Sequence, residues 1–337
     1  MTVRVAINGF GRIGRLVLRS IVEHGRKDIE VVAINDLGPV ETNAHLLRYD
    51  SVHGRFPAEV IVDGDTIHIA GYPSIKVTAE RDPAKLPHKA LNVDIALECT
   101  GIFTARDKAA AHLEAGAKRV IVSAPADNAD KTIVMGVNDD TLTADDLVIS
   151  NGSCTTNCLA PVAAVLQDLC GIERGYMTTI HSYTGDQPTL DTLHKDLYRA
   201  RAAAMSMIPT STGAAKALGL VIPALKGKLD GSSIRVPTPN VSVVDLKFVP
   251  GRKVTVDEIN AAMEKAAATP RLKGILCVTK EPLVSHDFNH VAASSTVALP
   301  QTQVIDGGLG RVLSWYDNEW GFSTRMSDTA IALSKLL

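Results

Sequence analysis

A glycine-rich turn near the amino terminus constrains the fold of this chain more than any other feature. Gly9-Phe10-Gly11-Arg12-Ile13-Gly14 follows a strand-like run, VRVAIN at 3–8, and opens a segment with the helical spacing of apolar residues. Asp36 lies 22 residues beyond Gly14, just after a second strand-like run, IEVVAIN at 29–35. A GxGxxG turn between a strand and a helix, followed at that distance by an acidic residue, is typical of a dinucleotide-binding fold.

The turn and Asp36 also predict which dinucleotide is bound. The glycines would let the main chain approach a pyrophosphate at the positive end of the following helix. Asp36 would hydrogen-bond the adenosine ribose hydroxyls and repel a 2′-phosphate, so the pattern favours NAD over NADP. The alternative is a plain turn followed by a solvated aspartate. Three residues end later predicted strands, at the edge where such sheets bind ligands, and are further candidates although each also suits a turn: Thr100, Gly101 and Ser123.

Strand-like and helix-like stretches alternate through the first half of the chain. A helix is predicted over 11–25, with Gly25 as a C-cap residue, and another over 106–117. Apolar runs predict further strands at 93–101, 118–125, 132–138 and 147–151. This alternation predicts an α/β Rossmann domain, with a doubly wound parallel sheet and helices on both faces.

The second half has a different pattern. Longer strands are predicted at 175–183, 231–237 and 242–250, and helices at 211–220, 256–267 and 324–337. A chain of 337 residues is expected to form a second domain, and this pattern predicts an α+β fold with a mainly antiparallel sheet. The residues between Tyr183 and Pro209 show no periodicity. A connection of that length is usually functional or part of an interface.

The stretch SNGSCTTNCLAP (150–161) surrounds Cys154 with hydroxyl and amide side chains. Cys154 is predicted to lie at or just before the first turn of a helix, where the helix dipole and nearby donors lower the pKa of a thiol. This setting is typical of a nucleophile, and the alternative is a small packed thiol. Cys158 is predicted to pack inside the helix, and a CxxxC pair is not a usual metal pattern, so no metal is expected. The other cysteines stand in apolar surroundings typical of a core: Cys99, Cys170 and Cys277.

His181 is the histidine best suited to activate that thiol. It ends the strand-like run YMTTIH, 27 residues beyond Cys154, and polar residues follow it. A histidine in this position can face a cleft, although many such histidines are structural. A bound nicotinamide and a reactive thiol together predict aldehyde oxidation. The thiolate would add to the carbonyl, a base would take the hydroxyl proton, and loss of a hydride would leave a thioester.

Anion-binding side chains in the second half indicate the kind of substrate. Arginine binds phosphate through two parallel hydrogen bonds, and threonine hydroxyls complement it. Candidates are Arg201, Arg235, Thr184 and the pair Thr212–Gly213, although an isolated arginine more often forms a surface ion pair. Two such subsites would suit a phosphorylated aldehyde and inorganic phosphate.

Composition argues against other kinds of partner. The formal net charge of −2 and the isoelectric point near 6.6 give no electrostatic reason to expect nucleic acid or a membrane. The sequence has no apolar run of the roughly eighteen residues that a membrane helix needs, and its start does not resemble a signal peptide. Five cysteines without disulfide-like spacing suggest a reducing compartment. A cytoplasmic protein with small-molecule partners is therefore predicted.

Several stretches of the chain, taken in order, indicate a family. INGFGRIGR, KRVIVSAP, SCTTNCLAP, TTIHSYTGDQ, IPTSTGAAKA and SWYDNEWGFS resemble those of phosphorylating glyceraldehyde-3-phosphate dehydrogenase, and the similarity extends along nearly the whole chain. The resemblance implies conversion of D-glyceraldehyde 3-phosphate to 1,3-bisphosphoglycerate with NAD and inorganic phosphate, a reaction of glycolysis and gluconeogenesis. It also implies a homotetramer in which the 184–209 segment reaches the cofactor of a neighbouring subunit.

The resemblance further implies residue roles and domains. Cys154 would be the nucleophile and His181 its base and thiol activator. The substrate phosphate would lie near Thr184 and Arg235, and inorganic phosphate near Ser153, Thr155, Thr212, Gly213 and Arg201. NAD would be surrounded by Arg12, Ile13, Asp36, Arg81, Ser123 and Asn318. An NAD-binding domain over 1–152 would be completed by the helix at 319–337, and a catalytic domain would span 153–318.

Three positions depart from the family pattern, and other interpretations stay open. Gly152 replaces an alanine and could loosen the helix start, Leu193 replaces a frequent proline, and Val291 a usual aspartate. The enzyme alternatives are erythrose-4-phosphate dehydrogenase, which usually has glutamate in place of Asp36, and a semialdehyde dehydrogenase. A non-catalytic NAD-binding scaffold is the alternative of another class. It would not need a reactive Cys154, so fast alkylation blocked by substrate would argue against it.

Overall fold

The computed structural model describes residues 2–337, which form two compact units. The first unit extends to Ile133 and also includes Asp139–Gly152 and Ser323–Leu337. The second contains Val134–Asn138 and Ser153–Phe322. Within the described part of the chain, no helix combines the length and the apolar character that a membrane span requires.

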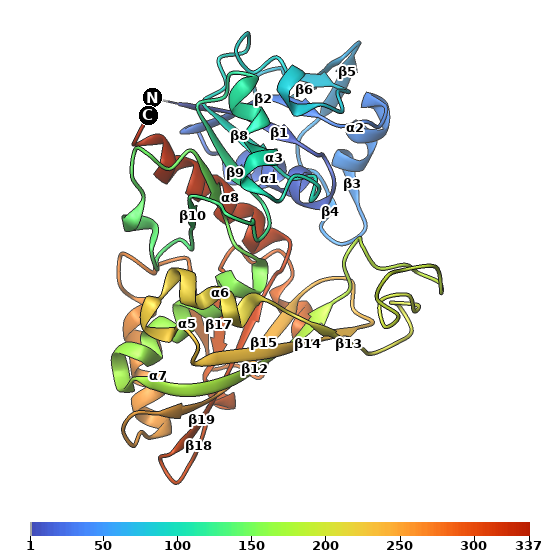
Figure 1. The fold of residues 1–337 in the computed structure, drawn as a ribbon. Helices are drawn as coiled ribbons and strands as arrows, with labels where there is room; N and C mark the ends of the chain where they lie inside the picture. The colour runs from blue at the N-terminus through green and yellow to red at the C-terminus, as the bar shows by residue number, and fades with distance from the viewer. Residues whose placement is uncertain (1) are drawn as a thin grey trace. The chain divides into compact units, whose positions relative to one another are not determined.

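A nine-stranded sheet forms the centre of the first unit (Figure 1), in the order β10-β11-β9-β8-β1-β2-β7-β6-β5. Neighbouring strands from β10 to β7 are parallel, and β5, β6 and β7 form an antiparallel extension. The strands are β1 (Val3–Asn8), β2 (Ile29–Asn35), β5 (Val60–Asp63), β6 (Thr66–Ile69), β7 (Ile75–Thr78), β8 (Ile95–Glu98), β9 (Arg119–Val122), β10 (Lys131–Thr132) and β11 (Val148–Ser150). A separate small sheet consists of β3 (Tyr49–Asp50) and β4 (Gly54–Arg55).

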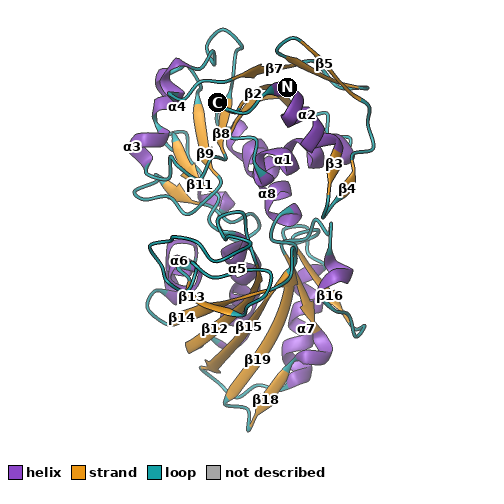
Figure 2. Cartoon of the chain, turned by 90° about the vertical axis from the view of Figure 1, so that its right-hand side faces the viewer, coloured by secondary structure: helices purple, strands orange, loops and turns teal. Residues whose placement is uncertain are grey.

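The first helix follows its sequence pattern closely. In α1 (Arg12–Glu23) the apolar residues Leu16 and Ile21 are buried, and Gly25 just beyond it has φ +61°, the left-handed conformation that ends many helices. The other helices of this unit are α2 (Val40–Arg48), α3 (Arg106–Ala109), α4 (Ala111–Glu114) and, from Ser323 onwards, α8 (Trp320–Ser334). Helix α8 lies beside α1 (Figure 2), and Asp328 on α8 accepts a hydrogen bond from Arg26 at 2.7 Å.

Two predicted elements differ in the structure. The strand expected over 132–138 is limited to β10, because a turn follows in which Oδ1 of Asn138 accepts from the N–H of Val134 at 2.8 Å. Gly136, with φ +80°, lies inside that turn. The helix expected over 106–117 is interrupted at Ala110 and divides into α3 and α4. Helix α2 and the strands β5, β6 and β7 have no counterpart among the sequence predictions.

The second unit is built on an eight-stranded sheet in the order β13-β14-β12-β15-β19-β17-β16, with β18 paired to β19. The pairs β12–β14 and β16–β17 are parallel and the other neighbours antiparallel, so the sheet is mainly antiparallel. Its strands are β12 (Ile172–Ser182), β13 (Ile208–Ser211), β14 (Leu229–Val236), β15 (Ser242–Pro250), β16 (Leu276–Thr279), β17 (Ser295–Ala298), β18 (Gln303–Ile305) and β19 (Leu309–Tyr316).

Three helices cover one face of this sheet (Figure 2): α5 (Cys154–Cys170), α6 (Ala214–Val221) and α7 (Val256–Ala267). They share a core with the sheet in which Leu166 of α5, Leu218 of α6, Met263 of α7 and Leu246 of β15 are fully buried. The predicted fold class is therefore confirmed: a Rossmann sheet followed by an α+β unit with a mainly antiparallel sheet.

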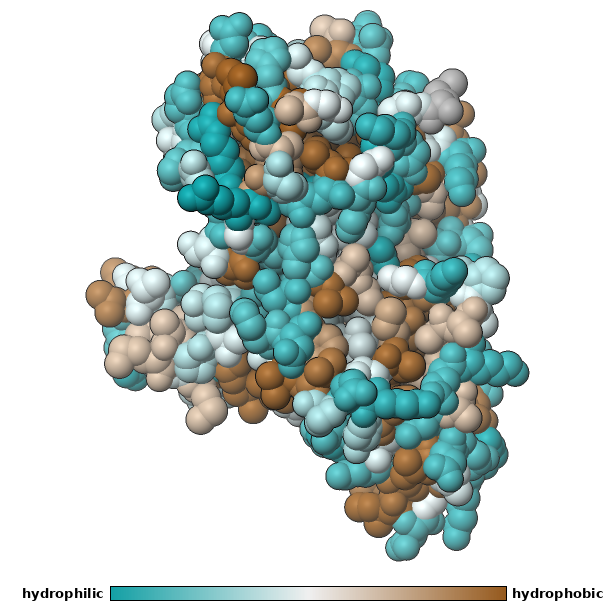
Figure 3. All heavy atoms as spheres, turned by 180° about the vertical axis from the view of Figure 1, so that it is seen from behind, coloured by the Kyte–Doolittle hydropathy of each residue, from teal (hydrophilic) through white to brown (hydrophobic). Residues whose placement is uncertain are grey.

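The segment between Tyr183 and Ile208 has turns but neither helix nor strand over its described residues, as its lack of periodicity predicts. It projects from the second unit (Figure 1), and apolar side chains gather on it (Figure 3). Its exposed large apolar residues are Leu190, Leu193, Leu197, Tyr198, Met205 and Met207. Exposed apolar surface of this extent is typical of an interaction site.

Candidate active site

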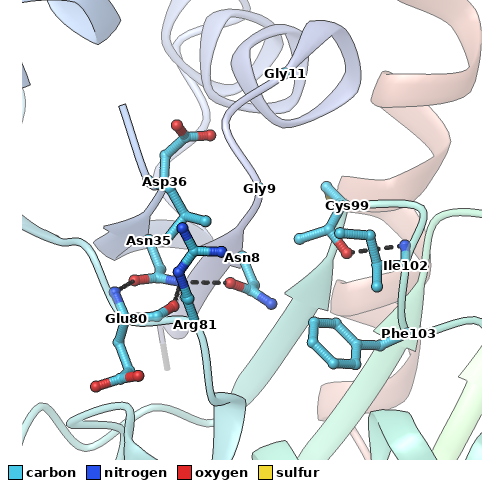
Figure 4. A pocket seen from close by; sticks show the side chains of 12 residues that line it. Asn8, Gly9, Gly11, Asn35, Asp36, Glu80, Arg81, Cys99, Ile102 and Phe103 are labelled. Atoms are coloured by element: carbon cyan, nitrogen blue, oxygen red, sulfur yellow. Dashed lines mark hydrogen bonds between the residues drawn. The ribbon is translucent and has the colours of Figure 1, made fainter. Parts of the chain in front are cut away.

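A cavity of about 500 Å³ lies at the carboxyl ends of β1, β2 and β8 in the first unit (Figure 4). It is lined by Asn8, Gly9, Gly11, Asn35, Asp36, Leu37, Glu80, Arg81, Cys99, Thr100, Ile102 and Phe103. The predicted cofactor residues among them are Gly9, Gly11, Asp36, Arg81 and Thr100. Asn8 and Asn35 are polar residues that end apolar strands, which is the signal that selected Thr100, so the sequence could have identified them too.

The glycine turn keeps the main chain close to the start of α1. Gly9 has φ +88°, and a Cβ atom there would lie 2.7 Å from the main-chain nitrogen of Thr100. A Cβ at Gly14 would lie 2.1 Å from the carbonyl oxygen of Gly9, whereas at Gly11 it would meet no atom within 4 Å. No side chain caps α1 at Gly11, and an uncapped helix start is where a pyrophosphate binds in dinucleotide folds. The turn therefore fits a dinucleotide.

Asp36 is held beside this turn. Its carboxylate accepts hydrogen bonds from the main-chain N–H groups of Phe10 and Gly38, each at 2.9 Å. A carboxylate fixed in this way suits the hydroxyls of a ribose and opposes a 2′-phosphate. The site thus fits NAD.

Several predicted cofactor residues do not line the cavity: Arg12, Ile13, Gly14, Gly101 and Ser123. Arg12 instead forms an ion pair with Asp50. Asn318 belongs to the second unit, where its Oδ1 accepts hydrogen bonds from the hydroxyls of Ser182 at 2.9 Å and Ser242 at 2.8 Å. The rotamer of Asn318 is therefore held by two donors.

The second unit brings Cys154 and His181 together. Cys154 is the first residue of α5, and Ser153 caps that helix by accepting from the N–H of Thr156 at 3.0 Å. His181 lies near the end of β12, with its Nε2 3.4 Å from Sγ of Cys154. Its Nδ1 lies 2.7 Å from the carbonyl oxygen of Ser182 and donates to it. In that tautomer Nε2 is free to accept the thiol proton.

Arg235 approaches the same imidazole from β14. This strand pairs in parallel with β12, and the register places Arg235 beside His181. Its Nη1 donates to the carbonyl of Ser182 at 2.9 Å and to the hydroxyl of Thr184 at 3.2 Å, and lies 2.9 Å from Nδ1 of His181. A fixed positive charge therefore stands next to the base and the thiol.

Burial and charge oppose each other at the thiol. Burial raises the pKa of the Cys154 thiol above its ordinary value, while Arg235 and the hydrogen bonds of Thr155 lower it. Burial and the charge of Arg235 together lower the pKa of His181 to about 3. The lowering of the thiol pKa expected from the helix start is thus outweighed by burial.

Arg199 joins this group, and Arg201 does not. The Nη1 of Arg199 pairs with Asp186 at 2.8 Å. Burial lowers the pKa of Arg235, and the nearby charge of Arg199 adds to that effect. Arg201 pairs instead with Asp191 at 2.7 Å, and both of these side chains are exposed. In this structure the charge of Arg199 thus lies near Arg235, whereas Arg201 pairs with a neighbour on the exposed segment.

The other predicted phosphate ligands lie at two helix starts. Gly213 is the N-cap of α6, and the hydroxyl of Thr212 accepts from a first-turn N–H at 3.2 Å. Ser153 holds the corresponding position at α5. The hydroxyl of Thr155 is buried 2.8 Å from the phenol oxygen of Tyr316, so it faces the core. The starts of both helices favour an anion, while the Thr155 hydroxyl is already engaged.

The three unusual positions have different settings. Gly152 has φ +65°, which glycine adopts without strain, so the residue suits the turn before α5 rather than loosening it. Leu193 is 100% exposed on the projecting segment. Nothing in the structure explains Val291. Among residues 2–337 there is no cluster of three or more His, Cys, Asp or Glu side chains that could hold a metal ion.

Fold and sites together define an NAD-dependent dehydrogenase that carries a thiol–imidazole pair. A family model described as glyceraldehyde 3-phosphate dehydrogenase, NAD binding domain, matches residues 3–106. The model described as the C-terminal domain of the same enzyme matches residues 153–318. The chain therefore belongs to the glyceraldehyde-3-phosphate dehydrogenase family, which confirms the resemblance of its motifs.

Full-length relatives agree with this assignment. The chain is 74% identical over 336 residues to glyceraldehyde-3-phosphate dehydrogenase of Xanthobacter flavus and 71% identical over 337 residues to that of Cereibacter sphaeroides, covering 100% of each chain. It is 60% identical over 331 residues to the enzyme of Geobacillus stearothermophilus, covering 98% of both chains. The predicted cofactor, NAD, is confirmed by the NAD-binding family model.

Proposed function

We propose that this protein oxidises D-glyceraldehyde 3-phosphate to 1,3-bisphosphoglycerate, with NAD and inorganic phosphate as co-substrates. The observation that carries the proposal is the 3.4 Å approach of Cys154 Sγ to His181 Nε2 beside Arg235, in a member of this family. The reaction is the one that the names of the relatives indicate.

Cys154 acts as the nucleophile in this proposal. Its sulfur bonds to the aldehyde carbon while the thiol proton passes through His181 to the aldehyde oxygen, which gives a hemithioacetal. NAD, when bound, supplies the acceptor for the hydride of that carbon. His181 takes the hydroxyl proton as the hydride leaves, and a thioester remains on Cys154. A phosphate oxygen then attacks the thioester and the C–S bond breaks. The sulfur recovers the proton held by His181, and the phosphate proton goes to water.

Two phosphate subsites are proposed around this pair. Arg235 and Thr184 would hold the substrate phosphate, which is supported by their 3.2 Å hydrogen bond beside His181. Arg199 would bind inorganic phosphate together with the start of α6 at Thr212. Arg199 takes the place of Arg201 because its charge lies near Arg235. An arginine aimed at each anion is the usual solution for phosphate recognition.

The alternatives have less support. The relatives, at up to 74% identity, are named glyceraldehyde-3-phosphate dehydrogenase rather than erythrose-4-phosphate dehydrogenase. A non-catalytic scaffold would have no need for Cys154 and His181 to approach each other, with Arg235 next to them. Cofactor binding alone would leave that arrangement without a purpose.

NADH formation tests the proposal directly. Fast turnover of glyceraldehyde 3-phosphate with NAD should require inorganic phosphate, and erythrose 4-phosphate should be a poor substrate. Cys154→Ser should lose acyl-enzyme formation and turnover but keep NAD affinity within about threefold, since the cofactor cavity belongs to other residues. Cys277→Ser is the matched control and should keep full activity. Undiminished turnover by the Cys154→Ser enzyme would end the mechanism.

We propose further that the first unit is the NAD-binding domain, the second the catalytic domain, and the active form a homotetramer. The tetramer is supported by the exposed side chains of Leu193, Leu197 and Met207 on the projecting segment, which a partner would cover. Light scattering on the purified protein, compared with Leu193→Asp, tests this point, and a monomeric wild type would contradict it. None of the five cysteines forms a disulfide among the described residues, which supports a reducing, cytoplasmic location.

A further inference from the structure

A buried chain of polar side chains in the first unit plays no part in the proposed chemistry. His88, which follows the 3₁₀ turn Pro83–Lys85, places its Nε2 3.0 Å from Nδ1 of His112 on α4. Nε2 of His112 lies 3.0 Å from Oε2 of Glu98, the last residue of β8. The exposed fractions are 3% for His88, 0% for His112 and 1% for Glu98. Burying a carboxylate and two imidazoles costs free energy, so the presence of these three side chains in the interior requires an explanation.

Glu98 connects this chain to the cofactor cavity. Its Oε1 accepts from the main-chain N–H of Thr100 at 2.8 Å and from the hydroxyl of the same residue. Its Oε2 accepts from Nδ2 of Asn8 at 2.6 Å as well as from His112. Thr100 and Asn8 both line the cavity. One carboxylate therefore holds the last residue of β1 and a residue just beyond the neighbouring strand β8.

The hydrogen bonds continue along the cavity wall (Figure 4). Oδ1 of Asn8 accepts from Nδ2 of Asn35 at 2.7 Å. Asn35 also binds the main chain of Glu80, donating to its carbonyl at 2.8 Å and accepting from its N–H at 2.9 Å. The ends of β8, β1 and β2 and the turn at Glu80 are thus linked by one continuous set of bonds that begins at the two histidines.

The turn after β8 has no room to move toward the glycine turn. The space where a Cβ of Gly9 would lie is 2.7 Å from the nitrogen and 2.8 Å from the Cα of Thr100. If Glu98 released Thr100, nothing would hold this close approach of the two turns, and the path that a pyrophosphate follows would change. The position of Glu98 therefore controls the shape of the phosphate-binding turn.

The proton arrangement makes His112 the decisive donor. A carboxylate oxygen only accepts, so Nε2 of His112, 3.0 Å from Oε2 of Glu98, is the donor of that bond. Nε2 of His88 lies 3.0 Å from Nδ1 of His112, and burial together with the neighbouring His112 lowers the pKa of His88 to about 4. Nδ1 of His88 is buried without a hydrogen-bond partner. This series of hydrogen-bonded side chains therefore ends at His88 on one side and at the cofactor cavity on the other.

We propose that His112 is a positioning residue for the cofactor: by donating to Glu98, it keeps Thr100 and Asn8 in the arrangement that binds NAD. His112 touches neither the cavity nor the reacting groups, and it acts through Glu98. Loss of this donor is expected to weaken NAD binding about tenfold, which corresponds to about 1.4 kcal/mol.

A matched pair of variants of the full-length protein tests this inference. His112→Gln can place its amide N–H where Nε2 stands, whereas the shorter side chain of His112→Asn cannot reach Glu98. The Asn variant should raise the Kd and KM for NAD about tenfold with kcat at saturating NAD within about twofold. The Gln variant should stay within about threefold of wild type in both constants. His68→Gln, on β6 and outside the cavity lining, is the control.

The readout separates positioning from general stability. A merely structural role would lower the melting temperature of the Asn variant and leave its KM for NAD unchanged, and that result would overturn the proposal. Equal weakening of NAD binding in the Gln and Asn variants would also overturn it. If the Asn variant does not fold, Glu98→Gln is measured instead, because the amide of glutamine has one acceptor oxygen fewer than the carboxylate of Glu98. That variant must then raise the Kd for NAD, and an unchanged Kd refutes the inference.

Discussion

The close contact between α1 and the glycine turn leads to a quantitative prediction. In Gly14→Ala the new Cβ would lie 2.1 Å from the carbonyl oxygen of Gly9 and 3.0 Å from Cγ2 of Ile7. Alanine inside a helix is favoured over glycine by up to about 1 kcal/mol. Overpacking costs about 1–3 kcal/mol, and here the oxygen that is met belongs to the main chain and cannot rotate away. We therefore expect the overpacking cost to reach at least about 3 kcal/mol. After the gain in helix propensity is subtracted, the free energy of unfolding should fall by about 2 kcal/mol.

Thermal unfolding without NAD measures this loss. A net loss of 2 kcal/mol corresponds to a melting temperature about 4–8 °C lower for a unit of this size. Gly11→Ala is the control, because its Cβ meets no atom within 4 Å and only the helix cap is altered. It should unfold within about 1 kcal/mol of wild type yet bind NAD at least tenfold more weakly. The reasoning fails if Gly14→Ala melts within 1 °C of wild type, or if both variants lose equal stability.

Three further predictions concern charged groups. Arg199→Ala should raise the KM for inorganic phosphate at least tenfold, while Arg201→Ala should change it less than twofold. A larger effect of Arg201→Ala would instead support Arg201 as the phosphate ligand. Burial raises the pKa of Asp50, but Arg12 and two main-chain N–H groups outweigh burial and lower it to about 2. Asp50→Asn should therefore lose about 2 kcal/mol of unfolding free energy at pH 7. In urea titrations the difference in unfolding free energy between this variant and wild type should become smaller as the pH falls from about 4 toward 2. Because Arg235 lowers the pKa of the Cys154 thiol, Arg235→Leu should shift the pH midpoint of iodoacetamide labelling upward, and an unshifted midpoint would contradict that role.

The first half of the fold follows from local sequence patterns. The strands VRVAIN and IEVVAIN occupy the predicted residues in β1 and β2, and α1 ends at Glu23, just before the predicted glycine, Gly25. These elements combine continuous apolar runs with strong turn residues, so propensity and burial favour the same structure. The strand predicted at 132–138 fails because an asparagine side chain binds the main chain locally, at Val134, and competes with the sheet.

The cofactor cavity could be predicted only in part, for a physical reason. Gly9, Gly11 and Asp36 act through their own main chain or through a motif of fixed spacing. Glu98 and His112 act through bonds to residues that are distant in sequence, and both read as ordinary members of a strand and a helix. Hydrogen-bond partners 90 residues apart, as in the bond between Asn8 and Glu98, depend on strand order, which no local pattern contains.

The approach of Cys154 to His181 illustrates the same limit in the second unit, because it depends on strand register and not on the motif alone. SCTTNC predicts the helix start at Cys154, but the base and the neighbouring cation come from β12 and β14. Their parallel register sets His181 opposite Arg235. A slip of one residue would turn one of these two side chains to the other face of the sheet, and the thiol would lose either its proton acceptor or the positive charge that favours the thiolate. Since Leu229–Val236 pairs with Gly175–Ser182 along eight consecutive positions, the register is held by the whole length of both strands. The surroundings of Cys154 therefore depend on the other paired residues of β12 and β14 as well, and substitutions that weaken this pairing should slow thiol alkylation before they unfold the protein.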